Sequence, residues 1–209
     1  MSFDLFILLN KTGQNLQERW LEKMGSVGVD VKFPKGFVIG DENVQDIPLQ
    51  IRFKPPLFNT VTVYESFDFN FGFTLISEEV RSEYLAGIEQ SRLHKKIKSM
   101  NTELQLYSQS GRNDKALIAQ CYLAACLVEA GDGVLVDPQE FGMVDGKYVY
   151  DVARAHCQAE LNKINGVTAN DVSDNKSSNS HQKIRPVKFW VLIFMALLAA
   201  DGIWNVFLR

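Results

Sequence analysis

Apolar and polar positions follow two different periods along the first 164 residues and predict both strands and helices. Residues 3–9 are almost all apolar, which is typical of a strand covered on both faces. Residues 60–76 alternate, with a Phe at every second position from 67 to 73. This alternation predicts one long strand, or two strands separated by a bend near residues 65–66. We expect the row of Phe side chains to lie in the core.

Helical spacing predicts helices over residues 14–25, 77–100 and 115–130, and a last helix that begins near Gly146. Residues 115–130 are apolar on nearly all sides, so this helix is expected at the centre of the core. The other expected strands cover residues 29–33, 37–39, 49–53, 104–107 and 134–136. Strands outnumber helices without regular interleaving, which predicts an α+β fold with one antiparallel or mixed sheet and helices on one side.

The C-terminal residues predict a transmembrane helix. Residues 189–208 are apolar except for a few positions, and as a helix they would span about 30 Å, the thickness of a bilayer core. Trp190 and Trp204 lie near the two ends, where interfacial aromatic side chains are expected. More basic residues precede the apolar run than follow it, so the body is expected to stay in the cytoplasm. The preceding basic residues are Lys183, Arg185 and Lys188.

Asp201 is the main objection to a membrane span, because a carboxylate at the centre of a spanning helix costs about 2.5–3.5 kcal/mol. Two alternatives remain: an interfacial helix, and a C-terminal helix that docks on the core. In a span, Asp201 would face a partner helix, a second copy or a headgroup. The expected organisation is a cytoplasmic domain over residues 1–164, a flexible linker over 165–186 and a transmembrane tail over 187–209.

Composition and motifs narrow the functional classes. The chain has 209 residues and a net charge of −3, which argues against a nucleic-acid-binding protein. Three Cys form no disulfide framework and suggest a reducing compartment. Cys121 and Cys126 are five residues apart and do not form a zinc pair, and His156 is expected to be a hydrogen-bonded core residue. We find no catalytic motif and predict no catalytic residue, cofactor or metal.

Two charged clusters are candidate contacts for a partner. One is basic and lies at the end of the helix expected over residues 77–100, where basic side chains also complement the helix dipole. Its members are Arg92, Lys95, Lys96 and Lys98. The other is an acidic turn that contains Asp41, Glu42 and Asp46. A solvated helix end is the simpler interpretation of the basic cluster, and contact with anionic lipid or an acidic partner is the alternative.

Two stretches are similar to small bacterial proteins of the toxin-immunity type. The first is the opening Ser2-Phe3-Asp4-Leu5-Phe6, and the second is the Ala-rich helix closed by Gly131-Asp132-Gly133-Val134-Leu135-Val136-Asp137-Pro138-Gln139. Several such proteins are thought to bind and neutralise a toxin from a competing bacterium. The resemblance implies a protein partner and assigns no binding residue.

The leading hypothesis is a non-enzymatic module, tethered to the bacterial inner membrane by a single C-terminal span, that binds a partner protein. Tethering would raise its effective concentration where that partner appears. Two other classes remain open. One is an enzyme or small-ligand domain that uses the Phe row at 67–73 as a pocket wall. The other is a subunit of a membrane complex in which Asp201 is paired.

Overall fold

The computed structural model describes residues 3–10, 15–40, 47–86, 88, 92–108 and 113–166. The strands are β1 (Phe3–Leu9), β2 (Val29–Lys32), β3 (Ile47–Phe53), β4 (Glu65–Leu75), β5 (Thr102–Ser108), β6 (Val134–Asp137) and β7 (Gly142–Asp145). The helices are α1 (Leu16–Val27), α2 (Glu78–Leu85), α3 (Arg92–Ser99), α4 (Asp114–Ala130) and α5 (Tyr148–Ile164).

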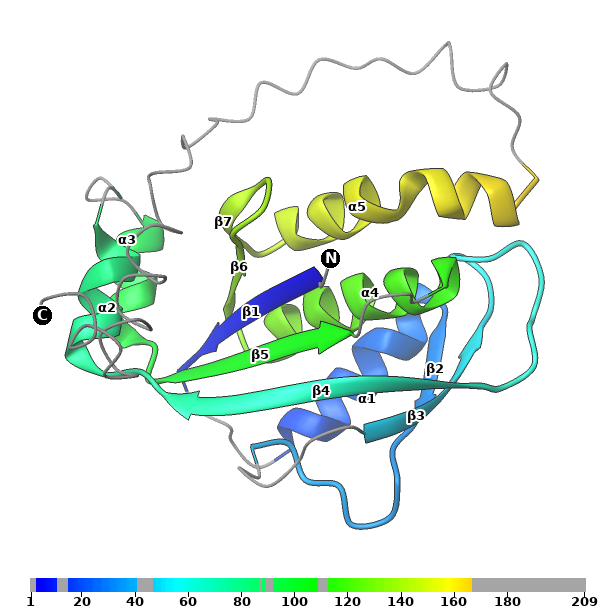
Figure 1. Cartoon of the computed structure of the whole chain (residues 1–209), viewed down its shortest axis with the longest axis horizontal. Coiled ribbons are helices and arrows are strands. Elements are labelled where there is room, and N and C mark those ends of the chain that lie inside the picture. The colour runs from blue at the N-terminus through cyan, green and yellow to red at the C-terminus, as the bar shows by residue number, and fades with distance from the viewer. Residues whose placement is uncertain are drawn as a thin grey trace, which may run out of the picture.

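The strands form one sheet in the order β2-β3-β4-β5-β1-β6-β7, and every neighbouring pair is antiparallel. The predicted α+β fold is confirmed, and the sheet is antiparallel rather than mixed. The N-terminal strand β1 lies between β5 and β6, so that Phe6 pairs with Gln105 on one side and with Val136 on the other. The long strand β4 crosses the middle of the molecule (Figure 1).

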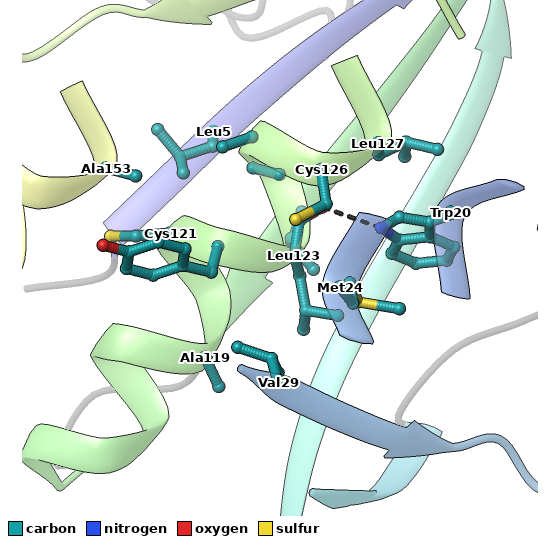
Figure 2. Packing of buried hydrophobic residues seen from close by; sticks show 14 of the residues in the cluster. Leu5, Trp20, Met24, Val29, Ala119, Cys121, Leu123, Cys126, Leu127 and Ala153 are labelled. Atoms are coloured by element: carbon teal, nitrogen blue, oxygen red, sulfur yellow. Dashed lines mark hydrogen bonds between the residues drawn. The ribbon is translucent and has the colours of Figure 1, made fainter. Parts of the chain in front are cut away.

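Helices α1, α4 and α5 pack on one face of the sheet, with α4 between the other two (Figure 1). This face and the buried cluster beneath these helices are called the first face and the first core below. As its sequence predicts, α4 is the central buried helix, since nearly every residue from Ala116 to Ala130 is buried. Its small side chains let α1 approach closely, and the buried indole Nε1–H of Trp20 donates to the Leu123 carbonyl at 2.9 Å. Figure 2 shows Trp20 beside Leu127 and Cys126 in this core.

The second face of the sheet is covered at one end by α2 and α3, which corrects the prediction that the helices would lie on one side. The physical reason lies in β1, whose side chains are buried in both directions. Leu5, Ile7 and Leu9 enter the first core, whereas Leu8 enters a second cluster beneath α2 and α3. The other buried members of the second cluster are Ile76, Tyr84, Ile97, Met100, Val134 and Val136.

Two expected elements differ from the structure, and one strand of the structure was not expected. Residues 37–39 form no strand: they follow a turn in which the Phe37 N–H donates to the Pro34 carbonyl, and Phe37 stacks on Phe33. The helix expected over 77–100 consists of α2 and α3, because Ala86 at the end of α2 is extended and Gly87 follows it. Strand β7 was not predicted, since its four residues carry too short a pattern.

The alternating segment resolves into a coil over residues 61–64 and strand β4. Phe67, Phe69 and Phe71 are buried in the first core, as predicted. Val61 and Val63, which continue the same alternation, are 62% and 75% exposed. The alternation therefore extends beyond the part of the chain that the sheet covers.

No helix in the described ranges is both long and apolar enough to cross a membrane. Most of the linker predicted over 165–186 and all of the tail predicted over 187–209 lie outside the described residues.

Gly28 closes α1 with φ +92°, and a Cβ there would lie 2.3 Å from the Lys54 carbonyl oxygen. We expect Gly28→Ala to lower the free energy of unfolding by about 2–4 kcal/mol, from left-handed strain plus this clash. Gly36→Ala is the matched control, because Gly36 has φ +86° and no atom within 4 Å of the added Cβ. Urea unfolding measures the free energy of unfolding of both variants. It is followed by the fluorescence of Trp20 in a chain shortened after Ile184, which lacks the other two Trp residues. An equal loss of stability in the two variants would contradict a role for the close contact at Gly28.

Candidate functional site

Helix α3 joins the body by two apolar side chains and presents a charged face to solvent. Leu93 and Ile97 are one turn apart and pack on the second cluster. The remaining arc of the helix carries three cations that the sequence analysis proposed as partner contacts. These are Arg92, Lys95 and Lys98, all of them exposed, and together they are called the α3 basic face below.

The fourth predicted cation, Lys96, lies between Arg92 and the buried side of α3 and is engaged within the body. Its Nζ lies 2.7 Å from Asp132 Oδ1 and 3.2 Å from Asp145 Oδ2. Only 12% of its side chain is exposed. Lys96 thus links α3 to the α4–β6 turn and to the end of β7, a structural role that the composition of the cluster did not show.

The α3 basic face has no such compensation within the described part of the chain. None of its three cations takes part in an ion pair between described residues. The neighbouring helix α2 carries exposed glutamates, of which Glu78 pairs with Arg81 on its own helix. The two helices therefore form a polar pair in which the positive charge is concentrated on α3.

The other residues proposed from the sequence lie outside the described ranges. This holds for the acidic turn with Asp41, Glu42 and Asp46, and for the membrane residues Trp190, Asp201 and Trp204. Their contact roles stay predictions.

A buried Asp–His pair holds the β6–β7 turn. The Asp137 carboxylate is completely buried and lies 2.8 Å from His156 Nε2. It also accepts hydrogen bonds from the backbone N–H groups of Gln139, Glu140 and Phe141. The Phe141 and His156 rings pack edge to face, with their centroids 5.2 Å apart. The expectation that His156 is a hydrogen-bonded core residue agrees with this geometry, although its partner, 19 positions away in the sequence, was not foreseen.

The electrostatics of this pair favour the charged carboxylate. Burial by itself raises the pKa of Asp137, but the hydrogen bonds from His156 and from the Gln139 and Phe141 N–H groups outweigh it and leave that pKa below its ordinary value. The pair is fully occupied with the turn. The geometry of the Asp137–His156 pair is therefore that of a group that holds the β6–β7 turn in place, rather than that of a catalytic dyad.

Other titratable groups also serve packing. Tyr84 on α2 donates to the Glu103 carboxylate on β5, and burial raises the pKa of Glu103. The three cysteines, all among the described residues, are buried and form no disulfide, and burial raises the pKa of Cys126 to about 12, which suppresses its thiolate. Among the described residues, no group of three or more His, Cys, Asp or Glu side chains is placed to hold a metal ion. The burial of Phe67, Phe69 and Phe71 counts against the pocket-wall alternative.

A scan against protein-family models finds no match. Searches of curated proteins and of solved structures find none either.

We expect Asp137→Asn to lower the free energy of unfolding by about 2–4 kcal/mol at neutral pH, because an amide cannot accept from all four donors. Since the folded pKa of Asp137 is lowered, its stabilising effect is present above the unfolded value of about 3.9 and is lost as the pH falls toward the folded pKa. The difference in free energy of unfolding between wild type and variant should therefore become smaller in acid. Chemical denaturation over a pH series measures this difference. A difference that grows in acid would contradict the stabilising role of the charged Asp137 carboxylate. The control is Asp151→Asn, at an exposed position on α5.

Proposed function

We propose that the chain is a membrane-tethered module that binds an acidic partner protein through the α3 basic face, as a toxin-immunity protein would. The single observation that carries the proposal is the set of three exposed cations on α3 that no carboxylate of the described fold compensates. Each of Arg92, Lys95 and Lys98 is exposed and has no ion pair with a described residue.

The stability of α3 accounts for only part of this charge. Lys96 and Lys98 lie in the last turn, where cations interact favourably with the helix dipole by about 0.3–1 kcal/mol. Arg92 is the first residue of the helix, where the same dipole disfavours a cation. A binding role explains a positive charge at both ends of the helix, whereas helix stabilisation explains it at one end.

Support for the membrane tether comes from the sequence. The apolar run at residues 189–208, the basic residues before it and the polar stretch after Ile164 have the composition of a span, its cytoplasmic flank and a linker. A linker of about 22 residues has a reach of roughly 25 Å. The body would thus remain close to the inner membrane, where a toxin that acts on or crosses that membrane arrives.

Cell fractionation tests the tether. We expect the full chain to stay in the membrane fraction after an alkaline carbonate wash, because a spanning helix is not released by high pH. A chain that ends at Ile184 should be soluble and folded. If the full chain is soluble and the shortened chain aggregates, residues 189–208 belong to the core and the tether is wrong.

Site-specific photo-crosslinking in cells tests the partner contact. A photoreactive residue at position 95 should capture one partner, whereas the same residue at Arg19 or Lys147, which are also exposed, should not. When the crosslinking is repeated in a cell lysate, capture of the partner should fall with added salt, because exposed charges are screened. If the partner is a toxin, the wild-type chain should restore growth of cells that express it.

The matching variant, Arg92→Gln with Lys95→Gln and Lys98→Gln, should weaken partner binding by between about threefold and a hundredfold, since each contact of an exposed charge contributes about 0.2–1 kcal/mol. Its thermal stability should stay unchanged, whereas Lys96→Gln should destabilise the body by about 1–3 kcal/mol and leave the α3 basic face in place. Arg19→Gln with Lys35→Gln and Lys147→Gln changes the net charge equally and is the control. Equal loss of binding in the control would show that net charge, rather than α3, is recognised.

A further inference from the structure

Segment 61–64 presents two apolar side chains to solvent from a fixed backbone. The Thr62 N–H donates to the Phe53 carbonyl at 2.9 Å, and the Phe53 N–H donates to Thr62 Oγ1 at 3.0 Å. These bonds tie the segment to the end of β3. Val61 and Val63, on either side of Thr62, are 62% and 75% exposed and belong to neither buried cluster.

Cations surround the aromatic ring that ends this segment. The Nζ of Lys32 lies 4.0 Å from the centroid of the Tyr64 ring, and Cζ of Arg52 lies 4.8 Å from it. Arg52 and Lys54 share one carboxylate, Asp30. Lys32, Arg52 and Lys54 thus outnumber the Asp30 carboxylate near this segment, and the Glu65 carboxylate that follows Tyr64 is paired with Lys115.

The point at which the chain leaves the body is attached to the loop just before this segment. The Asn59 N–H donates to Asn165 Oδ1 at 2.9 Å, and Asn59 Nδ2 donates to the Asn165 carbonyl at 3.0 Å. Asn165 Nδ2 in turn donates to the Leu57 carbonyl at 3.1 Å. Asn165 directly follows α5, so the chain beyond Gly166 starts beside the loop that precedes segment 61–64. Figure 1 shows the end of α5 and the loop between β3 and β4 at one end of the molecule, with α2 and α3 at the other.

We propose that segment 61–64, together with Lys32 and Arg52, is a docking surface for the anionic lipid headgroups of the membrane that holds the tail. This inference rests on the tether of the proposed function. Burial of exposed aliphatic side chains at the headgroup boundary is favourable because it removes apolar surface from water. A tyrosine has an apolar ring and a polar hydroxyl, which suits it to that depth. Each nearby cation adds about a fivefold preference for an anionic surface. The net positive charge disfavours a second copy of the same surface as the occupant.

A fluorophore at Thr60, an exposed position beside Val61, reports this contact in the full chain. Thr60→Cys can be labelled selectively because the native cysteines are buried. After reconstitution into vesicles of phosphatidylcholine with phosphatidylglycerol, we expect a blue-shifted emission that is absent in phosphatidylcholine alone. The same label at Glu79→Cys on α2, at the opposite end of the molecule, should show no shift.

The test variant combines Val61→Ser, Val63→Ser and Lys32→Gln in the labelled chain. We expect the ratio of docked to undocked body to fall at least about fivefold, the effect expected from one cation alone. Val38→Ser with Leu75→Ser and Lys35→Gln removes equally exposed apolar groups and one cation elsewhere, and should leave the ratio unchanged.

The outcomes separate this inference from the proposed function. A chain that floats with both kinds of vesicle but shows no shift at position 60 overturns the docking surface and leaves the tether. If the chain binds only anionic vesicles, and the test variant no longer binds them, the result supports docking and overturns the tether. A chain that floats with neither kind of vesicle overturns both proposals. A blue shift without vesicles that grows with protein concentration identifies an interface between copies and overturns lipid docking.

Discussion

The burial of β1 on both faces is the constraint on which the arrangement of the molecule depends. A strand that is apolar at nearly every position cannot expose either face to solvent, so the sheet needs cover on both sides where β1 lies. Helices α1, α4 and α5 supply it on one face, and α2 with α3 supplies it on the other. Gly133 shows how closely β1 is packed, since a Cβ there would lie 2.6 Å from the Leu8 carbonyl oxygen. The position of the α3 basic face is therefore a consequence of the N-terminal strand.

Local pattern predicted the elements that carry a long, uniform signal. Strand β1, the buried helix α4 and the Phe row of β4 were evident because their periodicity extends over seven or more residues. Strand β7 and the break between α2 and α3 were missed, since each depends on a few residues and on tertiary pairing. The alternation that marked β4 also runs through the exposed Val61 and Val63, because a period of two does not show where a sheet ends.

Candidate sites were predicted less well than elements, for a related reason. The four cations near the end of the expected helix are equivalent by composition, yet Lys96 is distinguished by carboxylates 36 and 49 residues away. Lys96 differs from Lys95 only in its direction around the helix axis. That direction has no meaning until the structure shows that Leu93 and Ile97 form the buried side of α3. Asp137 and His156 were each noted from the sequence, but their pairing requires β6 and α5 to be placed side by side.

The body is consequently polarised along its length. At one end, Asn165 ties the exit of the chain to the loop that precedes two exposed valines and a cation-flanked tyrosine. At the other end, α3 presents cations that the described fold leaves uncompensated. A tether that emerges from the middle of the molecule would let either end approach a membrane equally well. Under the proposed tether, an exit beside the apolar surface would favour one orientation, because docking that surface would need no extension of the proposed linker. In that orientation α3 would point away from the bilayer, where the proposed acidic partner would reach it without competing with lipid headgroups for the same charges.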